Sequence, residues 1–253
     1  MRASPPVASA ASLAGHVAVV SGGARGIGAA IALALAGDGA AVAVLDALDA
    51  GETVAVAAAA LGARSRAWMV DVGDEAACLD AVAAAEAALG PISILVCAAG
   101  VMPRGAVDSG LAQWRSVLRV NLDGARHLVA ACYPGMEARG DGRIVLVSSV
   151  AARQGGLLAG AEYSASKGAL LAFGRHVARN GAARNVRCNI LSPGVIETAM
   201  NADLPKPDPA ALPARRLGAP GDVAGPALFL CSDQASYITG VDLPVNGGQL
   251  FYP

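Results

Sequence analysis

Cysteine and histidine are scarce in this chain of 253 residues. It has five cysteines and three histidines, and no C-x-x-C motif occurs. The odd number and wide spacing of the cysteines disfavour a disulfide framework, and neither residue type is clustered with metal-ligand spacing. We therefore expect no metal site and a reducing, cytoplasmic environment.

An excess of charge of either sign is also missing. The chain carries 19 basic and 20 acidic residues, so its formal net charge is −1. Proteins that bind nucleic acids or anionic membrane surfaces usually show a basic excess, which this balance does not provide. We expect a small molecule as the partner, with no nucleic acid and no membrane.

Long uninterrupted apolar runs are absent as well. The most apolar stretch, residues 87–103, is broken by two glycines and two prolines, which excludes a membrane helix there. Residues 1–12 lack the continuous apolar segment of a secretory signal peptide, and we expect this N-terminal segment to be flexible.

Short aliphatic runs alternate with longer segments that are rich in alanine and leucine. The runs predict seven strands: Val17–Val20, Ala41–Leu45, Ala67–Val70, Ile92–Cys97, Arg143–Val147, Val186–Leu191 and Val241–Val245. The segments between them predict helices: Ile27–Ala36, Glu52–Leu61, Glu75–Leu89, Leu111–Glu137, Glu162–Arg179 and Asp222–Cys231. Strands that are apolar throughout are typical of a parallel sheet covered on both faces. We predict a single α/β domain over residues 13–253, a doubly wound sheet of about seven parallel strands with helices on both faces and a proline-rich lid loop at about 199–216.

Glycines crowd the loop after the first predicted strand. Residues 21–28 read S-G-G-A-R-G-I-G, and Gly22, Gly26 and Gly28 form the pattern G-x-x-x-G-x-G. The helix that follows offers free N–H groups and positive partial charge to a phosphate. No G-K-[ST] follows, so the loop is not a P-loop. The pattern predicts a phosphate site, with a purely structural turn as the alternative.

Asp46 ends the second predicted strand, 18 residues after Gly28. In dinucleotide-binding folds, a carboxylate at this place accepts hydrogen bonds from the ribose hydroxyls and repels a 2′-phosphate. The alternatives are a turn or helix-capping aspartate, and a pairing of Arg25 with a 2′-phosphate. We give the carboxylate more weight and predict NAD.

Tyr163 and Lys167 form a Y-x-x-x-K pair at the start of a predicted helix. The spacing places both side chains on one face, one turn apart. A neighbouring ammonium and an oxidised nicotinamide favour the phenolate, so we expect them to lower the pKa of the tyrosine toward a useful range. Taken alone, the pair is equally typical of a solvated helix face.

In combination, these features resemble the short-chain dehydrogenase/reductase family from about Leu13 to Gly248. The other matching segments are Asp71-Val72, Val120-Asn121, Ser148-Ser149, Pro193-Gly194 with Thr198, residues 216–224, and Asn246-Gly247-Gly248. Two features depart from the family pattern. Cys97-Ala98-Ala99-Gly100 stands where the family commonly shows N-N-A-G, and the 14 residues from Ser149 to Tyr163 are one more than the commonest interval.

The resemblance implies a Rossmann-like, NAD(H)-dependent oxidoreductase that interconverts a secondary alcohol and a ketone. It implies that Tyr163 is the acid and base, that Ser149 rather than Ser148 binds the substrate oxygen, that Lys167 binds the nicotinamide ribose, and that Asn121 supports a water relay. The residues it implies for the cofactor are Gly22, Arg25, Gly26, Ile27, Gly28, Asp46, Asp71, Val72, Ala98, Ala99, Gly100, Tyr163, Lys167, Pro193, Gly194, Ile196 and Thr198. We expect an apolar substrate pocket with walls from Met102, Val150, Leu157, Met200 and Leu204.

Two other functions stay open at this point. One is an NADPH-dependent carbonyl or 3-oxoacyl reductase, and the other is a non-catalytic dinucleotide-sensing or scaffold protein. The resemblance also implies a homotetramer, in which we expect the tail Gln249–Pro253 to be buried between subunits. We expect Arg104, Arg153 and Gln154 on the solvated surface, with a contact to a polar substrate substituent as the alternative.

Overall fold

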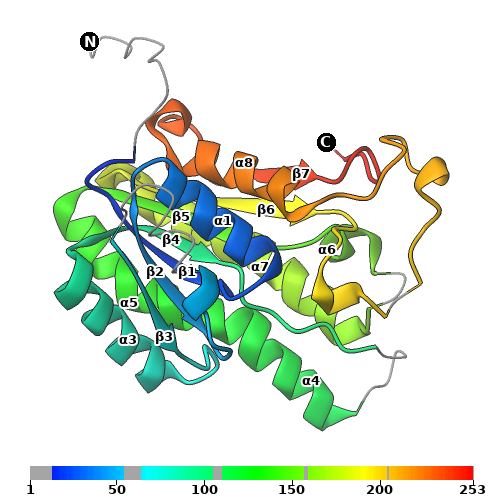
Figure 1. Cartoon of the computed structure of the whole chain (residues 1–253), viewed down its shortest axis with the longest axis horizontal. Helices are drawn as coiled ribbons and strands as arrows, with labels where there is room; N and C mark the ends of the chain where they lie inside the picture. Colours follow the sequence, from blue (N-terminus) through cyan, green and yellow to red (C-terminus); the bar gives the residue numbers. More distant parts are fainter. Residues whose placement is uncertain (1–12, 54–63, 105–109, 157–158, 204, 253) are drawn as a thin grey trace.

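Seven parallel strands form one sheet in the order β3-β2-β1-β4-β5-β6-β7 (Figure 1). The computed structural model describes residues 13–53, 64–104, 110–156, 159–203 and 205–252. The strands are β1 Val17–Ser21, β2 Ala41–Asp46, β3 Ser65–Met69, β4 Ile92–Cys97, β5 Gly142–Val147, β6 Val186–Pro193 and β7 Asp242–Val245. The predicted doubly wound parallel sheet is confirmed, and every strand end lies within two residues of its predicted position.

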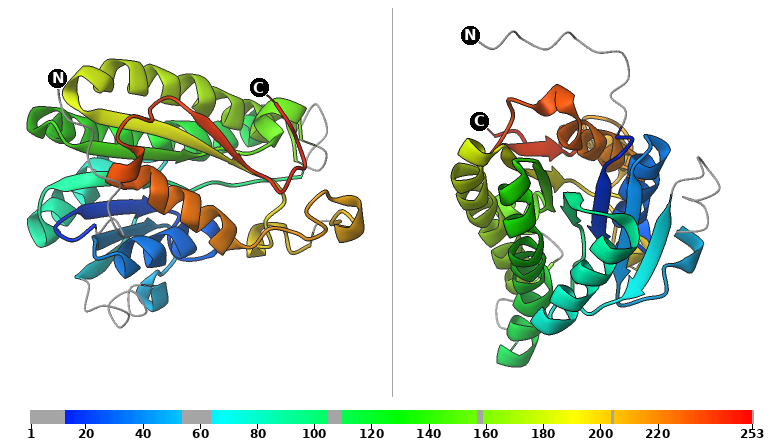
Figure 2. Two further views of the ribbon diagram at one scale, coloured as in Figure 1. Left: turned by 90° about the horizontal axis from the view of Figure 1, so that it is seen from above. Right: turned by 90° about the vertical axis from the view of Figure 1, so that its left-hand side faces the viewer.

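Helices cover both faces of this sheet (Figures 1 and 2). They are α1 Gly26–Gly37, α3 Glu75–Leu89, α4 Leu111–Leu118, α5 Gly124–Arg139, α6 Ala151–Gln154, α7 Ala161–Gly181 and α8 Pro220–Cys231. Short 3-10 turns follow at Ala182–Arg184, Ala199–Asn201, Pro209–Ala211 and Asp233–Ala235. Residues 54–61 of the predicted helix Glu52–Leu61 lie outside the described residues. Among the described helices, none is long and apolar enough to cross a membrane.

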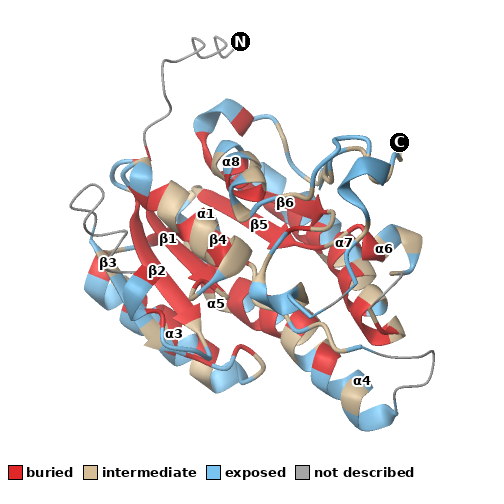
Figure 3. Cartoon of the chain, turned by 45° about the vertical axis from the view of Figure 1, so that its right-hand side comes forward, coloured by how far each residue is buried: buried red, intermediate tan, exposed pale blue. Residues whose placement is uncertain are grey.

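Alternate residues of the central strands belong to two separate cores. Val17 and Val19 of β1 pack in the cluster that α3, α5 and α7 complete, whereas Ala18 and Val20 pack in the cluster under α1 and α8. Both strand faces are therefore shielded from water, and the central strands are buried throughout (Figure 3). This double burial explains why β1 and β2 are almost entirely apolar instead of alternating with polar residues.

The predicted helix Leu111–Glu137 is helical throughout but is not a uniform α-helix. Residues Arg119–Asp123 form a π-helical turn between α4 and α5. This wider turn carries Asn121, which is only 1% exposed. Such turns occur often at functional sites, and this one lies beside the carboxyl end of β4.

Capping residues determine where several helices begin and end. The Asp74 carboxylate accepts a hydrogen bond from the Ala77 N–H at 3.1 Å and caps the start of α3. Gly140 takes a left-handed conformation (φ 66°) and ends α5, and Pro220 occupies the first turn of α8.

The strand order places a crevice at the carboxyl edge of the sheet. β1 and β4 are neighbours, but the chain leaves β1 toward α1 on one face and leaves β4 toward α4 and α5 on the other. The two loops therefore diverge, and the gap between them is where open α/β sheets bind their ligands.

Candidate active site

The glycine loop after β1 is shaped by contacts that exclude any larger side chain. A Cβ on Gly28 would lie 2.1 Å from the Gly22 carbonyl oxygen, and a Cβ on Gly22 would lie 2.6 Å from the Ala99 backbone nitrogen. Gly22 and Gly26 also have positive φ angles of 68° and 60°. Arg25, at the start of α1, makes no side-chain capping bond. The loop therefore leaves an open helix N-terminus, which suits a phosphate group.

Asp46 closes this loop from the end of β2. Its Oδ2 accepts a hydrogen bond from the Ala24 N–H at 2.9 Å, and its Oδ1 accepts one from the Leu48 N–H at 3.0 Å. The turn role that the sequence left open is thus present in the structure. Each carboxylate oxygen retains a further lone pair, so a ribose contact is compatible with this geometry.

Asp71 and Val72 follow β3 and lie against the helices of the opposite face. The Asp71 carboxylate accepts hydrogen bonds from the Gly73 N–H and the Arg119 guanidinium, each at 2.9 Å. Partial burial raises the pKa of Asp71, but these two bonds outweigh it and hold the pKa below its usual value. The Val72 carbonyl oxygen is paired with His127 Nδ1 at 3.0 Å.

Tyr163 and Lys167 lie one turn apart on α7 and are both buried. The Lys167 Nζ is 5.7 Å from the centre of the Tyr163 ring and donates a hydrogen bond to the Val147 carbonyl oxygen at 2.9 Å. Burial lowers the pKa of Lys167 to about 8. Burial also raises the pKa of Tyr163, and a hydrogen bond with Ser149 offsets only part of that rise. In the chain alone the loss of hydration dominates, and the lowering expected when an oxidised nicotinamide is bound stays a prediction.

The two serines at the end of β5 have different surroundings. Ser148 Oγ donates to the Lys167 carbonyl oxygen at 2.8 Å and so braces α7. Ser149 Oγ accepts from the Ala151 N–H at 3.1 Å and meets Tyr163. Both serines line the pocket, and the role of Ser149 as the serine that binds the substrate oxygen stays a prediction.

Asn121 holds the segment after β4 in place. Its Oδ1 accepts from the Val101 N–H at 2.7 Å, and its Nδ2 donates to the Val101 carbonyl oxygen at 3.0 Å and to Ser166 Oγ at 3.1 Å. A Cβ on Gly100 would lie 3.3 Å from Asn121 Oδ1 and 3.4 Å from Lys167 Nζ. Gly100 therefore lets the amide and the ammonium approach the same point.

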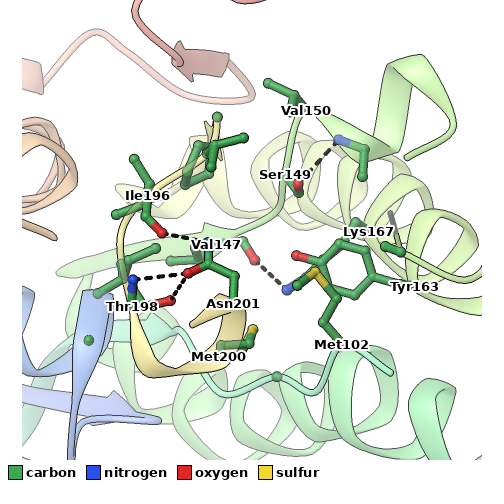
Figure 4. A pocket seen from close by; sticks show the side chains of 18 of the residues that line it. Met102, Val147, Ser149, Val150, Tyr163, Lys167, Ile196, Thr198, Met200 and Asn201 are labelled. Carbon is green, nitrogen blue, oxygen red and sulfur yellow. Dashed lines mark hydrogen bonds between the residues drawn. The ribbon is translucent and has the colours of Figure 1, made fainter. Parts of the chain in front are cut away.

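A pocket of about 480 Å³ joins the glycine loop to these catalytic candidates. Figure 4 shows Tyr163 and Lys167 at this cavity, together with Met102, Thr198 and Met200. The predicted site residues that line it are Arg25, Gly26, Ile27, Gly28, Ala98, Gly100, Met102, Ser149, Val150, Tyr163, Lys167, Pro193, Gly194, Ile196, Thr198 and Met200. Six predicted residues that are described do not line it: Gly22, Asp46, Asp71, Val72, Ala99 and Asn121. Leu157 and Leu204 lie outside the described residues.

Five polar residues of the pocket wall were absent from the predicted site. They are Ser148 just after β5, Gln154 on α6, Asn201 in the 3-10 turn Ala199–Asn201, Lys206 and Gln249. Gln154 had been expected on the surface, and Gln249 follows directly on the matched Asn246-Gly247-Gly248 segment. Arg104 and Arg153 do not line the pocket; Arg153 is paired with Asp242 instead. Among the described lining residues the charged ones are Arg25, Lys167 and Lys206, and none is acidic. No group of acidic, histidine or cysteine side chains in the described ranges could hold a metal ion.

Comparisons with known proteins agree with this arrangement. The family model described as enoyl-(acyl carrier protein) reductase matches residues 22–249. An acetoacetyl-CoA reductase from Shinella zoogloeoides is 37% identical over 245 residues, which cover 93% of this chain and 99% of that protein. A solved structure from Beutenbergia cavernae that contains NADP at low occupancy is 39% identical, with a TM-score of 0.88 and coverage of 94% and 98% of the two chains. A blue fluorescent protein from a metagenomic library, solved in complex with NADPH, is 35% identical, with a TM-score of 0.88 and coverage of 95% and 100%.

The fold and the site therefore define a nicotinamide-dinucleotide oxidoreductase that acts on hydroxyl and keto groups. The chain belongs to the short-chain dehydrogenase/reductase family.

Proposed function

We propose that the protein is an NAD(H)-dependent enzyme that interconverts a secondary alcohol and a ketone, with Tyr163 as the acid and base. One observation carries this proposal: Ser149, Tyr163 and Lys167 line the same cavity as the glycine loop. A protein that only senses or displays a dinucleotide needs no such cluster next to the phosphate site. The apolar part of the wall, which includes Met102 and Val150, suits a small or medium apolar substrate.

The residues present fit a nicotinamide dinucleotide. The loop between β1 and α1 is a cradle that a Cβ at Gly22 or Gly28 would fill, and it ends at an open helix N-terminus. Gly22 to Gly28 would hold the pyrophosphate, Asp46 the adenosine ribose, and Lys167 the nicotinamide ribose. The nicotinamide supplies or accepts the hydride, which is chemistry of the cofactor and not of the protein.

The side chains of the pocket account for the remaining chemistry. Ser149 and Tyr163 bind the substrate oxygen and fix its position, and the Tyr163 hydroxyl exchanges the proton with it. Lys167 is mostly protonated at neutral pH because its pKa is about 8, so it places positive charge beside the phenol. That charge opposes the effect of burial when Tyr163 has to lose its proton. Asn121 holds Val101 next to the site and supports a water through which the proton leaves.

The proposal and its main alternative differ in the cofactor, which is NAD in one and NADPH in the other. We propose NAD, because the Asp46 carboxylate lies at the end of β2 beside the loop. An NADPH-dependent carbonyl or 3-oxoacyl reductase is the alternative, and three observations favour it. The exposed Arg25 lines the pocket, two similar solved structures contain NADP or NADPH, and an acetoacetyl-CoA reductase is among the similar proteins.

Assembly and location form part of the same proposal. Residues 13–253 would act as one catalytic domain in a cytoplasmic homotetramer. In the single chain Phe251 is 82% exposed, so an apolar surface is available on the tail for contact with another subunit.

A substrate panel tests the proposed activity. Purified protein is incubated with secondary alcohols and NAD at alkaline pH, and with ketones and NADH at neutral pH, while the absorbance of the reduced cofactor is followed. NADP and NADPH are run in parallel. We expect turnover in both directions and none in Tyr163→Phe. Tight NADH binding without turnover of any alcohol or ketone would instead favour the sensing or scaffold function.

A further inference from the structure

The C-terminal tail supplies part of the pocket wall. After β7 the chain turns through Gly247 and Gly248, which have positive φ angles of 58° and 81°. The turn is held by the Asn246 side chain, which accepts from the Gly248 N–H at 3.0 Å and donates to the Leu250 carbonyl oxygen at 2.8 Å. This geometry brings Gln249 to the cavity that Ser149 and Tyr163 also line.

The amide of Gln249 has a defined orientation. Its Oε1 accepts a hydrogen bond from the Val195 N–H at 3.1 Å, just beyond the end of β6. A Cβ on Gly194 would lie 2.7 Å from that oxygen, so only glycine lets the amide lie so close. An N–H group can pair only with the oxygen of an amide, which fixes the other end as Nε2. That nitrogen carries two donor hydrogens, and none of the described residues accepts from it.

A second anchor holds the tail beyond Gln249. The Arg153 guanidinium lies 4.0 Å from the centre of the Tyr252 ring, which is a cation-π contact. The same guanidinium is bound to Asp242, with Nε and Nη2 each 2.9 Å from Oδ2. The Asp242 side chain is only 2% exposed and also accepts from Ser192 Oγ at 2.6 Å. Arg153 is exposed, as the sequence predicts, but its guanidinium is bound to a buried carboxylate and contacts the Tyr252 ring.

These contacts tie the tail to the loop that carries the catalytic serine. Arg153 belongs to α6, which begins two residues after Ser149, and Gln249 lies three residues before Tyr252. The amide is thus fixed at one end by Val195 and along the chain by Tyr252. A donor held from two sides loses little conformational freedom when it binds a ligand, so it discriminates well between an oxygen and a methylene group.

We propose that Gln249 is a specificity-determining residue that donates a hydrogen bond from Nε2 to a second oxygen of the substrate. The preferred substrates are then ketones that carry another carbonyl oxygen near the reacting one, such as 3-oxo esters or thioesters, and the corresponding hydroxy compounds. This inference rests on the proposed function and names the class of substrate for the same pocket.

A pair of matched substrates tests the role of the donor. Methyl acetoacetate and 2-hexanone both have a six-atom chain with a ketone at the second position, but only the ester has further oxygens. The ratio of their kcat/KM values is measured in wild type, Gln249→Leu and Gln249→Glu. We expect the ratio to fall by about 3- to 10-fold in Gln249→Leu, as for the loss of one neutral hydrogen bond. Gln249→Glu should lower it at least as much, because it keeps an acceptor for Val195 but replaces the donor.

Two control variants separate this role from a general loss of structure. Gln234→Leu makes the same chemical change at an exposed position of the turn after α8 and should leave the ratio as in wild type. Tyr252→Leu removes the aromatic face under Arg153 and should lower the ratio, whereas Tyr252→Phe keeps the ring and should restore it. The melting temperature of each variant is recorded alongside.

The possible failures are distinct. If wild type turns over both ketones but the ratio is the same in Gln249→Leu and Gln249→Glu, Gln249 does not select the substrate and the proposed function still stands. If wild type reduces neither ketone with NADH or NADPH, and oxidises no secondary alcohol, the proposed function fails and this inference fails with it.

Discussion

The Lys167 ammonium lies beside the Tyr163 ring but does not pair with its hydroxyl. Its Nζ is 5.7 Å from the ring centre, and its hydrogen bond goes to the Val147 carbonyl oxygen. Both residues are buried, at 8% exposure for Tyr163 and 4% for Lys167. The lysine is therefore held by β5 beside the ring, and the phenol hydroxyl remains available to a substrate.

Tyr163→Phe should abolish turnover and leave dinucleotide binding nearly unchanged. The substitution removes only the hydroxyl, which faces Ser149 and the cavity, and general acid-base groups typically contribute 100-fold or more to the rate. Turnover in the standard assay and NADH affinity by fluorescence titration are measured on the same preparation. Turnover within about tenfold of wild type would contradict the acid-base role, given that range.

The stability of the unligated protein should increase as the pH rises from about 8 toward 10, because the buried Lys167 loses its charge in this range. Burial depresses the pKa of the folded-state ammonium from 10.5 to about 8. Within that window the unfolded chain binds the proton and the folded chain does not, so stability increases with pH. Below pH 8 both states are protonated, and the charge costs the fold on the order of 3 kcal/mol.

The comparison that isolates this effect is between wild type and Lys167→Met. Denaturant unfolding at pH 7, 8, 9 and 9.5 should show the variant as the more stable protein at pH 7, with the gap closing as pH rises. Groups that do not interact with Lys167 titrate alike in both proteins and cancel in the difference, whereas the buried Cys97 is coupled to Lys167 and does not cancel. A gap that does not change with pH would mean that the pKa of Lys167 is not depressed.

Gly28→Ala should weaken dinucleotide binding by about tenfold or more, which corresponds to about 1.4 kcal/mol. The new Cβ would lie 2.1 Å from the Gly22 carbonyl oxygen, so the loop has to shift away from its present shape. Overpacking of this kind typically also lowers the free energy of unfolding by about 1 to 3 kcal/mol. Gly37→Ala, at the other end of α1, is the matched control because a Cβ there meets nothing within 4 Å. Equal NADH affinity in the two variants would contradict the assignment of the phosphate cradle.

The sheet could be predicted because its determinants are local. Continuous apolar runs such as Ile92–Cys97 define strands whose faces are both covered, and these runs need no partner to be recognised. The predicted range of β3 starts two residues too late, because the strand begins with the polar residues Ser65 and Arg66 at the sheet edge. The π turn around Asn121 was missed for another reason: it widens one turn inside a continuous helical segment, and the sequence patterns that predict helices do not distinguish a π turn from an α turn.

The site was predictable where it depends on short motifs and not where it depends on packing. Tyr163 and Lys167 are four residues apart, so their relation follows from helix geometry. The net pKa of Tyr163 depends on burial by the whole fold, which outweighs the hydrogen bond with Ser149. Gln249 reaches the pocket only through contacts with Val195, 54 residues earlier in the chain, which no local pattern reveals.

The enzyme should prefer NAD over NADP, and Asp46 should be the cause. A 2′-phosphate beside the Asp46 carboxylate places like charges a few Å apart, which costs on the order of 4 kcal/mol at an effective dielectric constant near 20. Arg25 is exposed and can recover part of this by pairing with the phosphate, so we expect a preference of about 10- to 1000-fold at about 1.4 kcal/mol per decade.

The kcat/KM values for both cofactors with one substrate should be compared in wild type, Asp46→Asn and Asp46→Ala. Asp46→Asn removes the charge but keeps one oxygen that can accept from the Ala24 or Leu48 N–H, so the glycine loop stays closed and the preference falls. Asp46→Ala loses both hydrogen bonds as well, so it should also weaken binding of either cofactor. A lower NAD preference in both variants identifies the charge as the determinant. If wild type favours NADP, or if the ratio is the same in all three proteins, Asp46 serves only to close the turn and the NAD assignment is wrong.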